Sequence, residues 1–231
     1  MLVVITGASK GIGYELTKQF LTDEENTVVA ISRSKEKLKA LQKKYPQNLI
    51  TVFGDLTNSR IIKQIVGLVA KNGKRVDILI NNAGSIVNKP FSKISFSELS
   101  NVYSVNVFAP FLLIQQLLPY LGKKTKSHIV NIGSMGGFQG SSKFSGLSAY
   151  SSSKSAIAGL TECLAEELKE KNIAVNCLAI GAVQTEMLTK AFPGYKAPLQ
   201  PNQMAGFILE FALTGHQYFN GKIIPVSSTT P

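Results

Sequence analysis

Three residues in the second half of the chain, Ser134, Tyr150 and Lys154, have types and spacings that suit proton transfer. Tyr150 and Lys154 are four residues apart, so on a helix they share one face, about 6 Å apart along the axis. A phenol titrates near pH ~10, too high for efficient proton transfer at neutral pH, and a neighbouring ammonium lowers that pKa. Ser134, which precedes this helix, can donate a hydrogen bond to a substrate oxygen. The trio predicts a general acid, although such a Tyr and Lys pair also occurs by chance on many helices.

The two histidines, His128 and His216, are the other side chains that titrate near neutral pH. His128 begins a predicted strand at its remote end and His216 lies in a late loop, so we expect both on the surface. The two cysteines, Cys163 and Cys177, are expected to be buried thiols in a reducing compartment. No group of His and Cys has the spacing of a metal site, so the sequence predicts no metal.

A glycine-rich turn near the start of the chain, Thr6–Gly13, has the composition of a phosphate cradle. It follows the apolar run 2–5, typical of a buried parallel strand, and precedes a predicted helix at 14–21. The start of such a helix offers unpaired N–H groups and the positive end of the helix dipole, which suit a dinucleotide pyrophosphate. The spacing is Gly-x-x-x-Gly-x-Gly rather than the commoner Gly-x-Gly-x-x-Gly, and a turn without a ligand is the alternative.

Each glycine of this turn has an expected task. Gly7 permits a tight turn, Gly11 lets the backbone approach the phosphates, and Gly13 lets helix and strand pack closely.

The end of the second predicted strand bears on the choice of cofactor. An enzyme that chooses NAD usually places Asp or Glu there, to accept from the adenosine ribose hydroxyls. This chain has Ser32 and Arg33 instead, and the guanidinium can grip a 2′-phosphate with two hydrogen bonds. Lys10, inside the glycine turn, could reach the same phosphate. These residues predict NADP(H) rather than NAD(H), and the alternative is that both cations are ordinary surface residues.

Two further strand ends carry polar residues that suit a nucleotide. Asp55 can accept from an adenine amino group while the Leu56 N–H pairs with the ring, or it can cap the next helix, and the sequence leaves both open. The short amide side chains of Asn81–Gly84 can tie neighbouring strand ends together, and Gly84 leaves room for a flat ligand.

These residues need a scaffold that brings strand ends together. Apolar strands alternate with helical segments along the chain, which predicts a parallel sheet with helices on both faces. In such sheets ligands bind beyond the carboxyl ends of the strands, where each predicted binding motif falls. Ser95 and Glu98 fit a capping box, and the helix that they begin is expected to bend at Pro110. The predicted strands are 2–5, 27–31, 49–53, 77–80, 128–133, 174–180 and 222–226, and the predicted helices are 14–21, 35–45, 58–72, 96–121, 149–171 and 202–213.

The length of 231 residues, without internal repeats or low-complexity tracts, suits one domain with a sizeable core. No apolar run reaches membrane-spanning length, and because the chain opens on its first predicted strand we expect no signal peptide. We therefore expect a cytoplasmic protein without membrane contact. The segment 184–201 contains several prolines and is expected to be a mobile substrate flap.

The net charge of +11, from 25 basic and 14 acidic residues, favours anionic partners. The basic residues are dispersed and lack interleaved aromatic residues, which argues against nucleic acid and for solvated surfaces. Docking of an acidic acyl-carrier protein is the less favoured possibility. The lysines that could serve it are Lys123, Lys124, Lys126, Lys169 and Lys171.

Together these motifs resemble the short-chain dehydrogenase/reductase family, from residue 2 to about residue 185. The resemblance implies a homo-oligomeric, NAD(P)-dependent oxidoreductase with a Ser–Tyr–Lys–Asn tetrad. Tyr150 would be the general acid in reduction, and Lys154 would lower its pKa and hold the nicotinamide ribose. Ser134 would orient the substrate carbonyl, and Asn106 would anchor a water that links Lys154 to solvent. The matching residues are Thr6–Gly13, Asp55, Asn81–Gly84, Asn106, Ser134, Tyr150 and Lys154.

The chain departs from the family pattern after the sixth predicted strand, where it reads Ile180-Gly181 in place of the frequent Pro-Gly. Val183 and Thr185 still fit, so cofactor contact is expected there. The expected cofactor contacts are Gly7, Ser9, Lys10, Gly11, Ile12, Gly13, Arg33, Asp55, Leu56, Asn82, Ala83, Gly84, Tyr150, Lys154, Gly181, Val183 and Thr185.

The sequence thus predicts one Rossmann-like α/β domain, residues 1–231, that transfers hydride between NADP(H) and a small carbonyl or alcohol substrate, as a carbonyl reductase does. A 3-oxoacyl-(acyl-carrier-protein) reductase-like enzyme and a non-catalytic NADP-binding regulator are the alternatives. The helical regions 97–121 and 149–171 carry more apolar positions than one sheet face can cover, which predicts a homodimer or homotetramer. Eight side chains could line a substrate pocket or equally pack on one another: Met135, Phe138, Phe144, Leu147, Met187, Leu188, Phe192 and Tyr195.

Overall fold

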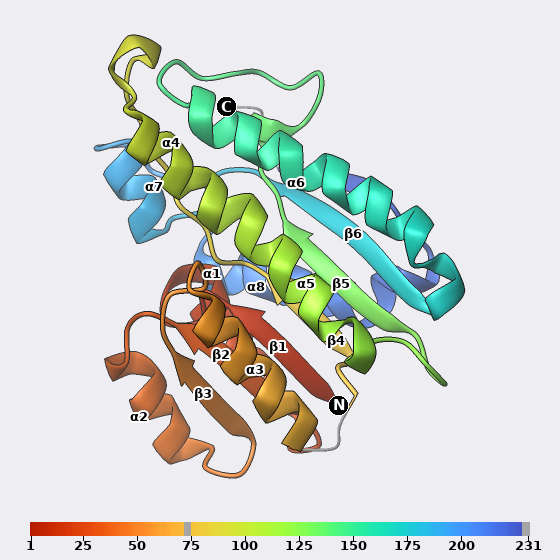
Figure 1. Ribbon diagram of the computed structural model, residues 1–231. Helices are drawn as coiled ribbons and strands as arrows, with labels where there is room; N and C mark the ends of the chain where they lie inside the picture. Colours follow the sequence, from red (N-terminus) through yellow and green to blue (C-terminus); the bar gives the residue numbers. More distant parts are fainter. Residues whose placement is uncertain (72–74, 228–231) are drawn as a thin grey trace.

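The computed structural model describes residues 1–71 and 75–227, and a parallel sheet of seven strands runs through its centre (Figure 1). The strands are β1 (Leu2–Thr6), β2 (Thr27–Ser32), β3 (Leu49–Phe53), β4 (Ile78–Asn81), β5 (Ser127–Ile132), β6 (Ile173–Ile180) and β7 (Ile223–Val226). Their order is β3-β2-β1-β4-β5-β6-β7, and every neighbouring pair is parallel. The predicted Rossmann-like, doubly wound sheet is therefore confirmed.

The helices that cover the sheet are α1 (Gly11–Phe20), α2 (Glu36–Lys44), α3 (Ser59–Lys71), α4 (Phe96–Tyr103), α5 (Ala109–Leu117), α6 (Ser148–Glu167), α7 (Glu186–Ala191) and α8 (Pro201–Thr214). Successive residues of a strand point to opposite faces, which divides the core in two. Val3 and Ile5 of β1 belong to the cluster under α1, α2 and α8, whereas Leu2 and Val4 belong to the cluster under α3, α5 and α6. In Figure 1 the second group of helices lies in front of the sheet.

The strand order reverses direction at β1 and β4, which lie side by side in the middle of the sheet. The connection from β1 leads through α1 toward β2, and the connection from β4 leads through α4 toward β5, on the opposite side. The two connections therefore diverge at the carboxyl ends of these strands and leave a crevice between them. Each predicted cofactor motif lies at this edge of the sheet.

The long helical region between β4 and β5 begins as predicted but is interrupted elsewhere. Ser95 and Glu98 form the capping box at the start of α4, as expected. The irregularity is a π-helical segment, η2 (Ser104–Phe108), which ends two residues before the bend expected at Pro110. Pro110 follows this segment within continuous helical backbone, so the hydrogen bond that its missing N–H cannot make falls beside the irregularity. Single π turns are frequent at functional sites, and this one contains Asn106.

By length and composition alone, the run Phe96–Tyr120 could cross a membrane, contrary to the expectation from the sequence. The buried helix of a folded core passes the same test. The inner side of this run packs in the core, with Leu113, Ile114 and Leu117 buried beside the sheet. Its composition is therefore explained by packing within the domain.

Most other boundaries differ from the prediction by one to four residues, and α1 begins at Gly11 rather than at residue 14. The helix expected at 149–171 ends at Glu167 and continues as a short 3-10 turn, after which Asn172 adopts a left-handed conformation with φ 59°. The helix expected at 58–72 begins at Ser59, and residue 72 lies outside the described residues. In the predicted flap, residues 186–191 form α7, and Val183 pairs with Leu199 in an isolated bridge.

Candidate active site

A cavity of about 440 Å³ opens at the carboxyl edge of the sheet, and it collects nearly all the residues that the sequence singled out. Asn106 and Gly13 are not among its lining residues. Asn106 is buried behind the cavity, and Gly13 packs beneath the glycine turn. The predicted residues that line the cavity are Gly7, Ser9, Lys10, Gly11, Ile12, Arg33, Asp55, Leu56, Asn82, Ala83, Gly84, Ser134, Tyr150, Lys154, Gly181, Val183 and Thr185.

The glycine turn is packed so closely that side chains are excluded from it. A Cβ on Gly13 would lie 2.4 Å from both the Gly7 carbonyl oxygen and Asn82 Nδ2. Gly7 has φ +70°, and a Cβ there would lie 2.9 Å from Ala83 Cα. Gly11 has φ +53°, and a Cβ there would lie 3.3 Å from Thr185 Cγ2. All three positions thus require glycine for packing or backbone conformation.

The first turn of α1 is open to an anion. Its N-cap position, Lys10, makes no side-chain capping hydrogen bond, and the first turn contains no acidic residue. The N–H groups at the start of a helix have no partners within the helix. Gly11 and Ile12, which begin α1, line the cavity, so these groups are available to a bound anion. This arrangement fits the predicted pyrophosphate site.

Hydrogen bonds from Thr6 and Asn82 tie the ends of β1 and β4 together. Thr6 Oγ1 accepts from the backbone N–H groups of Asn82 and Ala83, both at 3.0 Å. Asn82 Nδ2 donates back to the carbonyl oxygens of Thr6 at 2.9 Å and Gly7 at 3.3 Å. The sequence predicted the role of the amide and placed Thr6 in the glycine turn, but it gave the Thr6 hydroxyl no role.

At the end of β2 the structure has hydroxyl groups where a carboxylate would bind ribose. Ser32 Oγ donates to Ser9 Oγ at 2.5 Å and accepts from the Ser34 N–H at 3.1 Å. The Arg33 guanidinium is largely exposed, and its nearest carboxylate is that of Asp55 at 3.8 Å. The cation is therefore held loosely beside the cavity, in high-dielectric surroundings.

Asp55 closes a turn and does not cap the next helix. Its Oδ1 accepts from the N–H and the hydroxyl of Thr57, at 2.9 and 2.8 Å. The Thr57 N–H above all, with smaller help from the Arg33 charge, lowers the pKa of Asp55. At the start of α3 it is Asn58 that accepts from the Arg60 N–H. Of the two interpretations that the sequence left open, the helix-capping one is excluded.

Lys10 reaches across the cavity rather than toward β2. Its Nζ donates to Glu186 Oε2 at 3.2 Å, and this bond is the main reason that the pKa of Glu186 is lowered. The pair links the glycine turn to the start of α7. The sequence did not single out Glu186, because the two residues are 176 positions apart.

The catalytic candidates meet on the first turns of α6. Lys154 Nζ lies 5.9 Å from the centre of the Tyr150 ring and donates to the Ile132 carbonyl oxygen at 2.6 Å. Burial lowers the pKa of Lys154 to about 8. Burial also raises the pKa of Tyr150, and a hydrogen bond with Ser134 opposes that rise without cancelling it. The predicted lowering of the phenol pKa is thus wrong for this structure, because desolvation outweighs the favourable contacts.

Asn106 has its amide occupied by protein groups. Nδ2 donates to the Ser85 carbonyl oxygen and to Ser153 Oγ, both at 2.9 Å, and Oδ1 accepts from the Ser85 N–H at 2.8 Å. These bonds hold the segment after β4 against α6. Only one lone pair of Oδ1 stays available, so the water-anchoring role of Asn106 remains a prediction.

The rival titratable groups lie away from the cavity. His128 is 1% exposed, bonded to the Ala212 carbonyl oxygen and to Asn176, and burial lowers its pKa to about 4. The prediction that it lies on the surface is wrong, because α8 covers the start of β5. His216 is partly exposed nearby. Cys177 is buried as predicted, whereas Cys163 is exposed on α6.

The chain matches the family model described as short chain dehydrogenase over residues 1–196. It is 32% identical to the 3-oxoacyl-(acyl-carrier-protein) reductase FabG of Thermotoga maritima, over 96% of this chain and 94% of that protein. It is 33% identical to FabG of Buchnera aphidicola subsp. Baizongia pistaciae, over 80% of this chain and 75% of that protein. A solved structure of a 4-hydroxyisoleucine dehydrogenase mutant complexed with NADH and succinate aligns with a TM-score of 0.89 and 27% identity, over 100% of this chain and 98% of the other.

The tight packing around Gly13 predicts how a substitution there changes the stability of the protein. Gly13→Ala should lower the free energy of unfolding by about 1–3 kcal/mol, because the new methyl group overlaps the Gly7 carbonyl. Gly67→Ala on α3 is the matched control, since no atom lies within 4 Å of its Cβ position, and it should raise stability by about 0.5–1 kcal/mol. Urea unfolding of both variants measures the difference. Equal midpoints for the two variants would contradict the packing described here.

Proposed function

This chain belongs to the short-chain dehydrogenase/reductase family, and we propose that it transfers hydride between NADP(H) and the carbonyl or alcohol group of a small molecule. Family membership makes it an oxidoreductase with a nicotinamide cofactor. The observation that carries the proposal is that Ser134, Tyr150 and Lys154 line the same cavity as the glycine turn. A proton donor and a dinucleotide cradle thus open on one space.

The residues around the cavity fit the cofactor that the family uses. The open start of α1 and the glycine turn would hold the pyrophosphate, Asn82–Gly84 would border the nicotinamide end, and Tyr150 and Lys154 would hold its ribose. A Cβ on Gly84 would lie 3.6 Å from Met187 Cε and 3.9 Å from Lys154 Nζ, so Gly84 borders the same part of the cavity as these two side chains. The bound cofactor would supply or accept the hydride.

The protein's own task is to move the proton. In reduction, the substrate oxygen would accept a hydrogen bond from the Ser134 hydroxyl and the proton of the Tyr150 hydroxyl. The raised pKa of Tyr150 keeps the phenol protonated until negative charge develops on that oxygen. Lys154, one turn further along α6, would stabilise the phenolate that is left. Tyr150 would thus act as the acid, and Lys154 would assist after the proton has left.

The choice of NADP(H) rests on the end of β2. Ser32, Arg33 and Ser34 all line the cavity there, and among these described residues none is acidic. A 2′-phosphate could take two hydrogen bonds from Arg33 and further ones from the hydroxyls of Ser9 and Ser32. The related 4-hydroxyisoleucine dehydrogenase was solved with NADH, so NAD(H) is the alternative that an experiment must reject.

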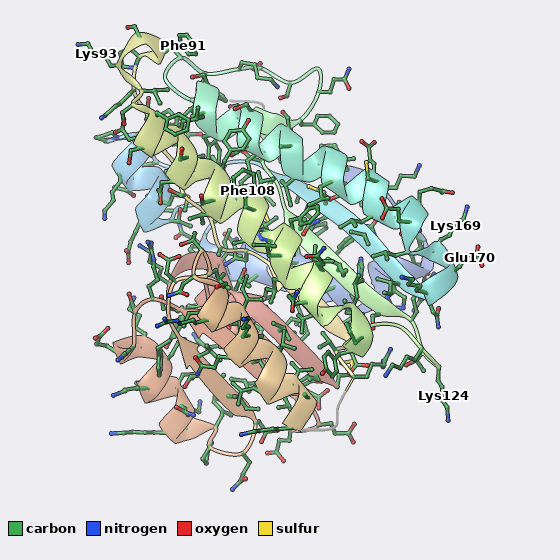
Figure 2. The ribbon with its side chains drawn as sticks, in the orientation of Figure 1. Phe91, Lys93, Phe108, Lys124, Lys169 and Glu170 are labelled. Atoms are coloured by element: carbon green, nitrogen blue, oxygen red, sulfur yellow. The ribbon has the colours of Figure 1, made fainter. Side chains whose placement is uncertain are left out.

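The similarity to 3-oxoacyl-(acyl-carrier-protein) reductases supports a 3-oxoacyl thioester as a second candidate substrate. The lysines that could dock a carrier do not favour such a substrate. Figure 2 shows Lys124 and Lys169 at the opposite end of the sheet from α7. They flank the start of β5, whereas the cavity borders its end, and a strand of six residues spans about 20 Å. A carrier bound there would present its thioester to the wrong edge.

Arg33→Ala tests the choice of cofactor. Loss of a charge-assisted hydrogen bond costs about 1.5–3 kcal/mol, so kcat/KM for NADPH should fall by about tenfold or more while that for NADH changes little. Lys35→Ala is the control, because Lys35 is also exposed nearby but does not line the cavity. Steady-state kinetics with both cofactors measures the effect. Equal use of NADPH and NADH by the native protein would refute the proposal.

Tyr150→Phe tests the proton donor. The ring stays and only the acidic hydroxyl is lost, so kcat should fall by at least about 100-fold while NADPH still binds. Lys154→Ala should impair both turnover and NADPH binding. In the native protein, kcat for reduction should decline as the pH rises through about 8, since the Lys154 ammonium is lost there. NADPH fluorescence beside kcat separates binding from turnover, and substantial activity in Tyr150→Phe would overturn the assignment.

We further propose that the chain forms a homodimer or homotetramer through the outer face of α4, η2 and α5. Phe108, Phe111 and Leu112 are 54%, 46% and 41% exposed on this face, and Figure 2 shows Phe108 on the surface. The exposed residues of α6 are small or acidic, so the excess of apolar positions expected there is not found. They include Ser152, Ser155, Gly159, Glu162, Cys163, Glu166 and Glu167.

The double variant Phe108→Glu, Phe111→Glu should shift the protein to a smaller species in sedimentation velocity, because charges would replace the contact surface. Tyr218→Glu is the control, since Tyr218 is 76% exposed outside this face. A native protein that sediments as a monomer at all concentrations would end the proposal.

A further inference from the structure

The outer half of the cavity has an apolar wall built by two segments far apart in the chain. Phe144 comes from the loop between η4 (Met135–Gly137) and α6, and Phe192 directly follows α7. Their rings meet edge to face, with centroids 6.3 Å apart, and both line the cavity. Tyr195, 43% exposed, and the partly exposed Met187 and Leu188 line the same side. We call Phe144, Phe192 and Tyr195 the aromatic wall.

The sequence left open whether these side chains pack on one another or line a pocket. Of the eight candidate side chains, Phe138 does not line the cavity and the other seven do. Phe144 and Phe192 do both, because their contact closes one side of the cavity and does not fill it. The rings and the sulfur of Met187 leave apolar surface facing an open space. Such surface is stabilised by contact with an apolar or aromatic group, edge to face or through sulfur.

Most charges of the cavity lie away from the aromatic wall, and Glu186, which begins α7 before Met187, is the exception. Among the described residues that line it, those with a formal charge are Lys10, Arg33, Asp55, Lys154 and Glu186. Lys10 is paired with Glu186, and Arg33 lies beside Asp55 at the end of β2. Lys154 is bonded to the Ile132 carbonyl oxygen on the floor, at the reacting centre. None of these cations belongs to the aromatic wall.

The lysines closest in sequence to the aromatic wall do not line the cavity either. Lys143 precedes Phe144, but its Nζ is bonded to the Phe138 carbonyl oxygen and to Ser141. Lys190 and Lys196 flank Phe192 and Tyr195 and are exposed outside the lining. A carboxylate or phosphate on the remote part of a substrate would therefore lose water and gain no cation.

We propose that the aromatic wall selects uncharged ketones or aldehydes that carry an aromatic group or a bulky alkyl group, and that Phe144 and Phe192 determine this specificity. The inference rests on the proposed carbonyl reduction, whose proton donor lies at the floor of the same cavity. The polar floor would receive the carbonyl oxygen, and the aromatic wall would receive the rest of the molecule. Anionic analogues of the same shape would be rejected for lack of a partner charge.

The test uses two molecules that differ in one charge, methyl 4-acetylbenzoate and 4-acetylbenzoate. We expect kcat/KM for reduction to favour the ester by at least about 100-fold, because the carboxylate is desolvated against the aromatic wall. Phe144→Ala and Phe192→Ala should each lower kcat/KM for the ester by about tenfold, and lower that for 2-butanone by less. Phe192→Arg should raise kcat/KM for the carboxylate at least about tenfold, by providing the missing cation.

The matched control is Phe207→Ala. The Phe207 ring contacts Phe211 with centroids 6.4 Å apart, a spacing like that of Phe144 and Phe192, but Phe207 is on α8 and does not line the cavity. Its loss should leave the ratio of ester to carboxylate unchanged. A similar drop in Phe207→Ala would show that the effect of the cavity variants comes from general loss of packing and would overturn the specificity role.

Calorimetric titration of both molecules separates this inference from the proposed function. The protein is first saturated with whichever oxidised nicotinamide cofactor it binds, so that no reduction occurs. Tighter binding of the ester without reduction in the kinetic assay would support the aromatic wall and overturn the proposed reaction. Equal binding of the two molecules, no binding of either, or equal kcat/KM for both would overturn the inference about the aromatic wall.

Discussion

The junction between the ends of β1 and β4 is the constraint on which the rest of the site depends. Two diverging connections leave a crevice there, and the hydrogen bonds between Thr6 and Asn82 hold its two edges at a fixed spacing. That spacing leaves no room for a side chain at Gly7 or Gly13. The start of α1 is thereby placed against the strand ends, with its unpaired N–H groups directed to the same space that α6 borders from the other side.

Burial then decides the protonation states on the floor of the cavity. The same desolvation that raises the pKa of Tyr150 lowers that of Lys154, since each neutral form is favoured away from water. A protonated phenol is the form that a proton donor requires. The position of both groups depends on α6, which Asn106 fastens to the segment after β4 through its bonds to Ser85 and Ser153. The π segment that contains Asn106 is thus part of the support of the catalytic helix.

The two sides of the cavity carry side chains of different chemistry. Strand ends and the start of α1 supply hydroxyl, amide and charged groups along one side. The loop before α6, the helix α7 and the segment after α7 supply aromatic and sulfur-containing side chains along the other. A dinucleotide is charged and polar along most of its length, so it suits the first side. An apolar group suits the second. The pair of Lys10 and Glu186 connects the two sides, because it joins the glycine turn to α7.

The sequence by itself determined the features that depend on local pattern. Alternating apolar strands and helices predicted the parallel sheet, the spacing of glycines predicted the cradle, and Ser95 with Glu98 predicted the start of α4. The sequence also predicted that the site residues share one cavity, because the carboxyl ends of parallel strands meet at one edge of the sheet.

Only the tertiary structure decided the properties that depend on packing between distant segments. It buried His128 under α8, paired Lys10 with a residue 176 positions later, and raised the pKa of Tyr150 despite a lysine one turn away. It also showed that the helix irregularity is a π segment around Asn106, just before Pro110. Burial and long-range pairing arise from surfaces that meet only when the chain is folded, so no local pattern of residues contains them.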